Sequence, residues 1–426
     1  MHHAVVIRDR TPVRRRLECV KVVFLSVLLA LTCSTTLYMS RLKVSSPSND
    51  NANIPREQNK RKVSSTLLYS PPPPTARSVS ESKFLTYANA VPADQFSKFD
   101  ESVTLTTHGT HDFLQHTPVL CKRWRGPVSL AVYAPGPDYA VVLDKISFLR
   151  RCSEPCVRAN VTWHIVSDSD DPPVKPGKTT AYVLAPGNRS CSSDVMTATF
   201  VNFRRVHKKV YPVNVLRNLA RKHAKTRYLM ASDIELYPSQ GIIPRFLRLV
   251  QRRKDRSSVK EVYALQPFEV RADQDAPLIK RELVRMLGNG TAVFFHQKFC
   301  AACHMVPEWK QWLSYLPDDD ALDIFTTETD ARNNSLWEPI YIGTNAEPLY
   351  PEEMSWEGKR DKFTQRYEMC LMGYKFHVLD NAFLVHAPGI KEEGEIKMLS
   401  LHHEVQGSAQ ARSNLKAWAR PSPRHL

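Results

Sequence analysis

Residues 211–239 read YPVNVLRNLARKHAKTRYLMASDIELYPS, and they join a predicted helix to a predicted strand. Val215 and Leu219 lie on one stripe of the helical segment, residues 211–226, so this stripe would pack on a sheet. The apolar run at residues 228–231 then reads as a buried strand that ends at two acidic residues. A helix that leads into a strand is one half of a βαβ unit, so the stretch predicts an α/β fold.

The same alternation continues on both sides of this stretch. Short apolar runs predict strands at residues 127–135, 161–167, 180–186, 262–270, 338–343 and 375–386. Longer segments with helical character lie at residues 138–151, 241–251, 277–287 and 359–372. We therefore expect a mixed, mostly parallel sheet with helices on both faces. No internal repeat and no second domain boundary is visible, so we place one domain at residues 121–400.

The N-terminal quarter of the chain predicts a membrane anchor. Residues 20–39 are apolar apart from Lys21 and are long enough to cross a bilayer, and several arginines precede them. This pattern predicts a cytosolic tail at residues 1–19 and a single transmembrane anchor at 20–39. A cleaved signal peptide is the alternative, with Ala30 and Ser34 near a possible cleavage site.

The predicted anchor places the rest of the chain in the lumen of the secretory pathway. Residues 40–120 contain a run of four prolines and many polar residues, and we interpret them as a disordered stem. Residues 401–426 form a predicted C-terminal tail. Glycosylation acceptor triplets agree with a lumenal position; they begin at Asn160, Asn188, Asn289 and Asn333.

Charge and cysteine content narrow the class of protein further. The formal charge is +16, but the basic residues are scattered and part of the excess lies in the N-terminal tail, so nucleic-acid binding is not favoured. Seven of the nine cysteines follow the predicted anchor. In an oxidising lumen they should mostly pair, which leaves at least one thiol outside a disulfide.

Asp233 and Glu235 are the first candidate site residues. If the chain is extended here, residues i and i+2 point to the same face, and both carboxylates follow a strand at the edge where open α/β sheets bind ligands. Two adjacent carboxylates repel each other, and a divalent cation such as Mg²⁺ or Mn²⁺ would remove this repulsion and bind a diphosphate in turn. On spacing alone, a solvated acidic turn before Pro238 is the simpler reading of the same residues.

Four blocks of sequence resemble one family of enzymes. Residues 211–239 are similar to the region around the D-x-D motif of LARGE-type and β-1,4-glucuronyltransferase-1-type glycosyltransferases. WEPIYIG (337–343), LYPEEMSWEGK (349–359) and YEMCLMGYKFHVLDNAFLVHAPGIK (367–391) resemble the C-terminal half of the same family. The likeness covers about residues 125–395. It implies a GT-A fold, a UDP-sugar donor, a divalent metal and a type II membrane protein of the Golgi.

The resemblance assigns metal ligands to three positions. Asp233 and Glu235 match the two acidic residues of the D-x-D motif, and His386 matches a C-terminal histidine that completes the metal site. A buried structural histidine is the simpler reading of His386 when it is taken alone. This chain departs from the family at Glu235, where the family usually has aspartate. The glutamate side chain is one methylene longer, which predicts a different metal or a different metal geometry.

The resemblance also suggests residues for chemistry. An inverting transfer needs a carboxylate that accepts the proton of the acceptor hydroxyl. Glu352 matches the glutamate of the family and is our choice. Glu353, Asp361 and Glu269 are the alternatives.

Three polar side chains of the helix at residues 211–226 share one face, because Asn214, Arg217 and Asn218 are spaced three and four residues apart. They are predicted to contact the uracil, ribose or phosphate of the donor, and surface solvation with helix capping is the alternative. Lys391 is a predicted partner of the diphosphate.

The resemblance implies transfer of glucuronic acid from UDP-glucuronate, with inversion, to a xylose-containing glycan on a glycoprotein. Two alternatives remain: a LARGE-like transferase with another UDP-sugar or linkage, and a catalytically weak lumenal protein that binds glycans or stabilises a partner. Homo-oligomers, or hetero-oligomers with other glycosyltransferases, are compatible with the sequence.

Two further motifs have simple structural explanations. Cys300-Ala-Ala-Cys303-His304 is compatible with zinc, but a second C-x-x-C is absent, so disulfide bonding is favoured and a redox role is a third reading. Trp309, Trp312 and Tyr315 have the spacing of a helix that packs on a core, or of rings that stack on an acceptor sugar.

Overall fold

The structure is a computed structural model that describes residues 83–174, 180–185, 191–198, 200–253, 260–330, 336–354 and 361–390. The predicted anchor at residues 20–39, the C-terminal tail and Lys391 lie outside these residues. Within them, no helix combines the length and the apolar character that crossing a bilayer requires.

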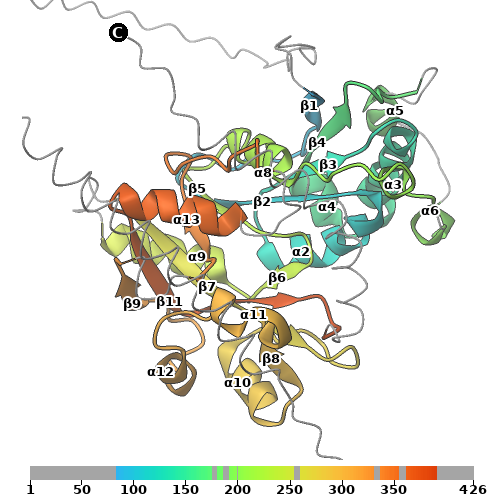
Figure 1. Cartoon of the computed structure of the whole chain (residues 1–426). Coiled ribbons are helices and arrows are strands. Elements are labelled where there is room, and N and C mark those ends of the chain that lie inside the picture. The colour runs from blue at the N-terminus through green and yellow to red at the C-terminus, as the bar shows by residue number, and fades with distance from the viewer. Residues whose placement is uncertain are drawn as a thin grey trace, which may run out of the picture. The chain divides into compact units, whose positions relative to one another are not determined.

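Strands and helices alternate through most of the chain (Figure 1). The strands are β1 (Phe84–Val91), β2 (Val103–Gly109), β3 (Val128–Tyr133), β4 (Val161–Asp168), β5 (Tyr228–Ala231), β6 (Leu236–Pro238), β7 (Glu261–Val270), β8 (Ala292–Phe294), β9 (Ile324–Glu328), β10 (Ile340–Gly343) and β11 (Lys375–His386). The helices are η1 (His111–His116), α2 (Thr117–Trp124), α3 (Asp138–Cys152), α4 (Pro155–Asn160), α5 (Thr180–Leu184), α6 (Asp194–Thr197), α7 (Phe203–Val206), α8 (Val213–Lys222), α9 (Ile242–Arg252), α10 (Lys280–Gly288), α11 (Gln297–His304), α12 (Trp309–Ser314) and α13 (Asp361–Leu371).

One mixed sheet contains all of these strands. Its main path runs β1-β4-β3-β2-β5-β10-β7-β11-β6, while β8 pairs with β7 and β9 with β11. The neighbours β4, β3, β2 and β5 are mutually parallel, and β7 is parallel to β11. The remaining pairings are antiparallel. The predicted mixed α/β sheet is therefore confirmed, with its parallel run in the N-terminal half.

Strand β3 shows why helices cover both faces of the sheet. Val128, Leu130 and Val132 belong to a buried cluster that includes residues of α3. The alternate residues Ala131 and Tyr133 belong to another cluster, together with residues of α8. Because successive side chains of a strand point to opposite faces, an uninterrupted apolar strand must be covered twice.

Two sequence-based expectations about secondary structure and the start of the domain are wrong. Residues 180–186 were expected to form a strand, but α5 occupies Thr180–Leu184, since a short apolar run fits a helix and a strand equally well. The predicted stem reached residue 120, yet β1 and β2 are strands of the sheet, and β2 lies between β3 and β5. The burial of β2 comes from strands that follow it in the chain, so local composition did not reveal it.

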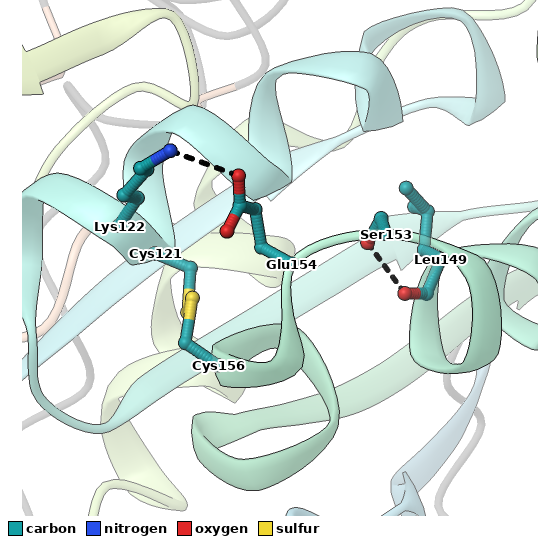
Figure 2. The surroundings of a disulfide bond; sticks show 6 residues. All are labelled: Cys121, Lys122, Leu149, Ser153, Glu154 and Cys156. Carbon is teal, nitrogen blue, oxygen red and sulfur yellow. Dashed lines mark hydrogen bonds and ion pairs between the residues drawn. A yellow bond between two sulfur atoms is a disulfide. The ribbon is translucent and has the colours of Figure 1, made fainter.

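The cysteines pair as an oxidising compartment predicts. Disulfides join Cys121 to Cys156, Cys152 to Cys191, and Cys300 to Cys303, and Cys370 stays outside a disulfide. The disulfide reading of the C-x-x-C motif is confirmed. Figure 2 shows the Cys121–Cys156 bond, which ties α2 to α4. An ion pair between Lys122 and Glu154 lies beside it, with 3.0 Å between Nζ and Oε1.

A buried histidine on β4 makes stability depend on pH. His164 is fully buried; its Nδ1 accepts the Asn89 N–H at 2.9 Å, and its Nε2 lies 2.9 Å from the Ser129 Oγ. Burial, with smaller contributions from His223 and Lys225, lowers the pKa of His164 from 6.5 to about 3. The neutral ring therefore contributes stability that is present above pH 6.5 and is lost as pH falls toward the folded-state pKa.

We expect His164 to lower the free energy of unfolding by about 2 kcal/mol between pH 7 and pH 5, because only the unfolded chain takes up its proton in that range. Urea unfolding at the two pH values measures the change. The His164→Gln variant should be less stable at pH 7 but less sensitive to pH. Equal pH dependence in the two proteins would contradict the prediction.

Candidate active site

The acidic pair lies in a turn rather than in a strand. Strand β5 ends at Ala231, and the Leu236 N–H donates to the Asp233 carbonyl at 3.1 Å, which closes a β-turn. Ile234 is buried inside this turn. The extended geometry that was predicted to point Asp233 and Glu235 to the same face is therefore absent.

Three basic side chains from different elements surround the Asp233 carboxylate. Arg217 of α8 donates from Nη2 to Oδ1 at 3.0 Å, and Lys362 of α13 donates from Nζ to Oδ2 at 2.8 Å. His108, near the end of β2, has its Nε2 at 3.4 Å from Oδ1. The side chains of Arg217 and Lys362 are 5% and 9% exposed, so water weakens these ion pairs little.

These contacts determine the protonation states of Asp233 and His108. Burial alone would raise the pKa of Asp233, but Lys362, a hydrogen bond from His108, and Arg217 hold it well below its usual value. Burial lowers the pKa of His108, and Arg217 and Lys362 lower it further against the opposing effect of Asp233. Asp233 is therefore ionised and His108 neutral near pH 7.

His108 and Lys362 were missed by the sequence analysis. His108 lies in the segment that was assigned to the stem, although a histidine at the C-terminal end of a parallel strand is a signal for this edge of the sheet. Its Nδ1 is 2.8 Å from the hydroxyl of Tyr211, which precedes α8. Lys362 follows Asp233 by 129 residues, and no local pattern links the two.

The polar face of α8 holds the loop that contains Glu352. The amide of Asn214 donates to the carbonyls of Pro351 at 2.8 Å and Met354 at 3.2 Å. The Asn218 amide donates to the carbonyl of Tyr350 at 2.8 Å and accepts its N–H at 2.9 Å. The predicted common face of α8 is thus confirmed, and its two asparagines bind protein backbone. Their contact with a donor stays a prediction.

Glu352 is brought to the same face of α8 as Arg217. Its Oε1 accepts from the Asn218 Nδ2 at 2.9 Å, and Lys222 Nζ lies 3.9 Å away. The side chain is 43% exposed, so its carboxylate reaches solvent. Helix α8 therefore contacts both Glu352, the predicted base, and Asp233.

Glu235 precedes β6, and His386 ends the adjacent strand β11 at the edge of the sheet. His386 is paired with Leu236 across β6 and β11, and the Ala387 N–H donates to the Glu235 carbonyl at 2.7 Å. The Nδ1 of His386 is 2.8 Å from the Ala387 carbonyl. A carbonyl can only accept, so Nδ1 carries the proton and Nε2 has the lone pair in the neutral ring.

The side chains present do not fit a divalent metal ion. In the part of the chain that the structure describes, which includes Asp233, Glu235 and His386, no three His, Cys, Asp or Glu residues form a group that could hold one. Both oxygens of Asp233 contact basic groups instead. Two unit charges of like sign at 4 Å repel by about 4 kcal/mol at an effective dielectric constant of 20, and a divalent ion beside a lysine doubles this. The predicted metal site is not formed.

A second buried carboxylate lies near His386. Glu269 of β7 is 4% exposed, and its Oε1 accepts the His296 N–H at 3.0 Å. Glu269 follows Phe268, and Phe268 pairs with Val385, the residue before His386. The side chains of Glu269 and His386 therefore occupy neighbouring positions on β7 and β11. The Phe295 ring lies 5.9 Å from the His386 ring. Glu269 therefore remains an alternative base.

The aromatic series on α12 has a packing role. Trp312 is fully buried, and the Lys280 Nζ lies 3.6 Å from the centre of its ring. Trp309 packs edge-to-face on Phe294, whereas Tyr315 is 51% exposed. Helix packing is therefore confirmed for the two tryptophans.

Comparison with known proteins gives the family. The family described as "Glycosyl-transferase for dystroglycan" matches residues 102–420, about three quarters of the chain. The chain belongs to this family. The start of the match at residue 102 agrees with the inclusion of β2 in the folded domain.

Individual relatives agree with this result. β-1,4-Glucuronyltransferase 1 of Mus musculus is 30% identical over 302 residues, which is 68% of each chain. The Danio rerio protein of the same name is 29% identical over 69% of this chain and 68% of its own. The human xylosyl- and glucuronyltransferase LARGE1 is 28% identical over 67% of this chain but only 31% of its own. The chain is therefore a glycosyltransferase.

Proposed function

We propose that this family member transfers glucuronic acid from UDP-glucuronate to a xylose-containing glycan acceptor with inversion at C1. The relatives named β-1,4-glucuronyltransferase 1 match over two thirds of both chains, which supports this donor. The observation that carries the mechanism is the shared face of α8, which holds Arg217 against Asp233 and Asn218 against Glu352.

The proposed reaction assigns one role to each group. The acceptor hydroxyl attacks C1 of the glucuronate, the bond between C1 and the β-phosphate oxygen breaks, and the carboxylate of Glu352 takes the hydroxyl proton. UDP leaves with its negative charge, which Arg217 and Lys362 stabilise. Asp233 positions both cations through its two oxygens. No step uses a metal, because the donor set does not fit one.

The cellular setting is part of the same proposal. Residues 20–39 anchor the protein in the Golgi membrane, and the catalytic domain faces the lumen, where acceptor glycoproteins pass. Three disulfides in the described residues suit an oxidising compartment.

A screen of donors tests the proposal. The full chain in detergent is incubated with UDP-glucuronate, UDP-xylose or UDP-galactose, each with a β-xyloside or a β-glucuronide acceptor, and products are identified by mass spectrometry. We expect product with UDP-glucuronate and the xyloside. Product only from UDP-xylose and the glucuronide would reverse the assignment of donor and acceptor, an outcome that the similarity to LARGE1 makes worth including.

A further inference from the structure

Lys362 is held firmly in place beside Asp233. It is the second residue of α13, and its side chain is 9% exposed. One turn later in the same helix, Gln365 donates to the Pro348 carbonyl at 2.7 Å and accepts from the Tyr341 hydroxyl at 3.0 Å. These buried contacts fix the start of α13 against the loop that α8 binds, so the position of Lys362 is set by the fold.

The ammonium group of Lys362 contacts the Asp233 carboxylate where a metal ion would otherwise bind it. It makes a 2.8 Å charge-assisted hydrogen bond to one oxygen of Asp233, while Arg217 binds the other at 3.0 Å. A divalent ion could use this carboxylate only by displacing one of these two groups.

The backbone of the second acidic residue of the motif is tied to the end of β11. Glu235 lies in the turn after Asp233, and its backbone carbonyl is paired with Ala387. Glu235 replaces the usual aspartate at this position, and its carboxylate is one methylene further from the backbone.

We infer that Lys362 replaces the metal ion in this chain and, together with Arg217, binds the diphosphate of the nucleotide donor, so that donor binding does not require a divalent cation. The inference rests on the proposed function, which supplies the nucleotide. An arginine and a lysine bind phosphate oxygens through charge-assisted hydrogen bonds, and Asp233 keeps the two groups in position.

Titration calorimetry with UDP tests this inference. UDP is titrated into the full chain in detergent, once with EDTA and once with Mn²⁺, and Mn²⁺ is titrated separately without nucleotide. We expect the UDP affinity to agree within about twofold in the two buffers and Mn²⁺ alone to show no saturable binding. Lys362→Met should weaken UDP binding at least about tenfold, which corresponds to the loss of one charged hydrogen bond.

Two variants control for charge and folding. Lys362→Arg keeps the positive charge and should retain most of the UDP affinity in EDTA. Lys375→Met removes an exposed lysine at the opposite end of β11 from His386, and should bind UDP as the wild type does. Thermal melting shows whether each variant folds. If Lys362→Met does not fold, UDP binding by the wild type in the two buffers and by Lys362→Arg tests the inference.

The possible failures are distinct. UDP binding that appears only with Mn²⁺ would overturn the inference and the metal-free mechanism, and leave the proposed transfer of glucuronic acid standing. Unchanged UDP binding by folded Lys362→Met would overturn the role of the lysine. The absence of UDP binding in both buffers would overturn the inference and the proposed function together.

Discussion

Replacing Asp233 by alanine should reduce sugar transfer at least about 100-fold, because Arg217 and Lys362 lose the carboxylate that positions them beside the leaving diphosphate. The same substitution should lower the free energy of unfolding by about 2–4 kcal/mol, since it removes one member of a largely buried ion-pair group. Transfer is measured by product formation with UDP-glucuronate, and stability by urea unfolding in EDTA.

The stability measurement separates two roles of Asp233. A carboxylate that served only as a metal ligand would be dispensable for the fold in EDTA, and its removal would leave stability nearly unchanged. Asp233→Asn is the matched control, because it keeps the size of the side chain but not its charge, and it should lose transfer as well. Full activity in either variant would refute any role of this residue at the site.

Replacing Glu352 by glutamine should reduce the turnover number at least about 100-fold, which is the usual contribution of a general base. An amide cannot accept the proton of the acceptor hydroxyl, but its oxygen can still accept the hydrogen bond from Asn218. UDP affinity and thermal stability should therefore stay close to the wild type. Steady-state assays measure the turnover number, UDP titration the affinity, and thermal melting the stability.

The neighbouring residue provides the control for this experiment. Glu353 is also exposed, and Glu353→Gln should keep most of the activity. If Glu352→Gln retained more than about a tenth of wild-type turnover, the base would have to be another carboxylate. Glu269, buried beside His386 at the end of β7, would then be the next residue to change.

The sequence by itself was sufficient for features that depend on nearby residues. The apolar runs at β3, β4, β7 and β11 and the helices α3, α8 and α9 were predicted, because side-chain periodicity is a local property. The grouping of Asn214, Arg217 and Asn218 on one helix face follows from the same periodicity. The odd number of cysteines after residues 20–39, the predicted anchor, likewise implied at least one outside a disulfide.

The tertiary structure decided which of these groups meet. A turn at Asp233 replaced the expected extended chain, and Lys362, 129 residues away, came to lie against the carboxylate because α13 packs against the loop held by α8. His108 joined them because β2 inserts between β3 and β5. The sequence places two acidic residues after a strand. The position of Lys362 beside Asp233 depends on contacts between distant segments, which no local pattern encodes.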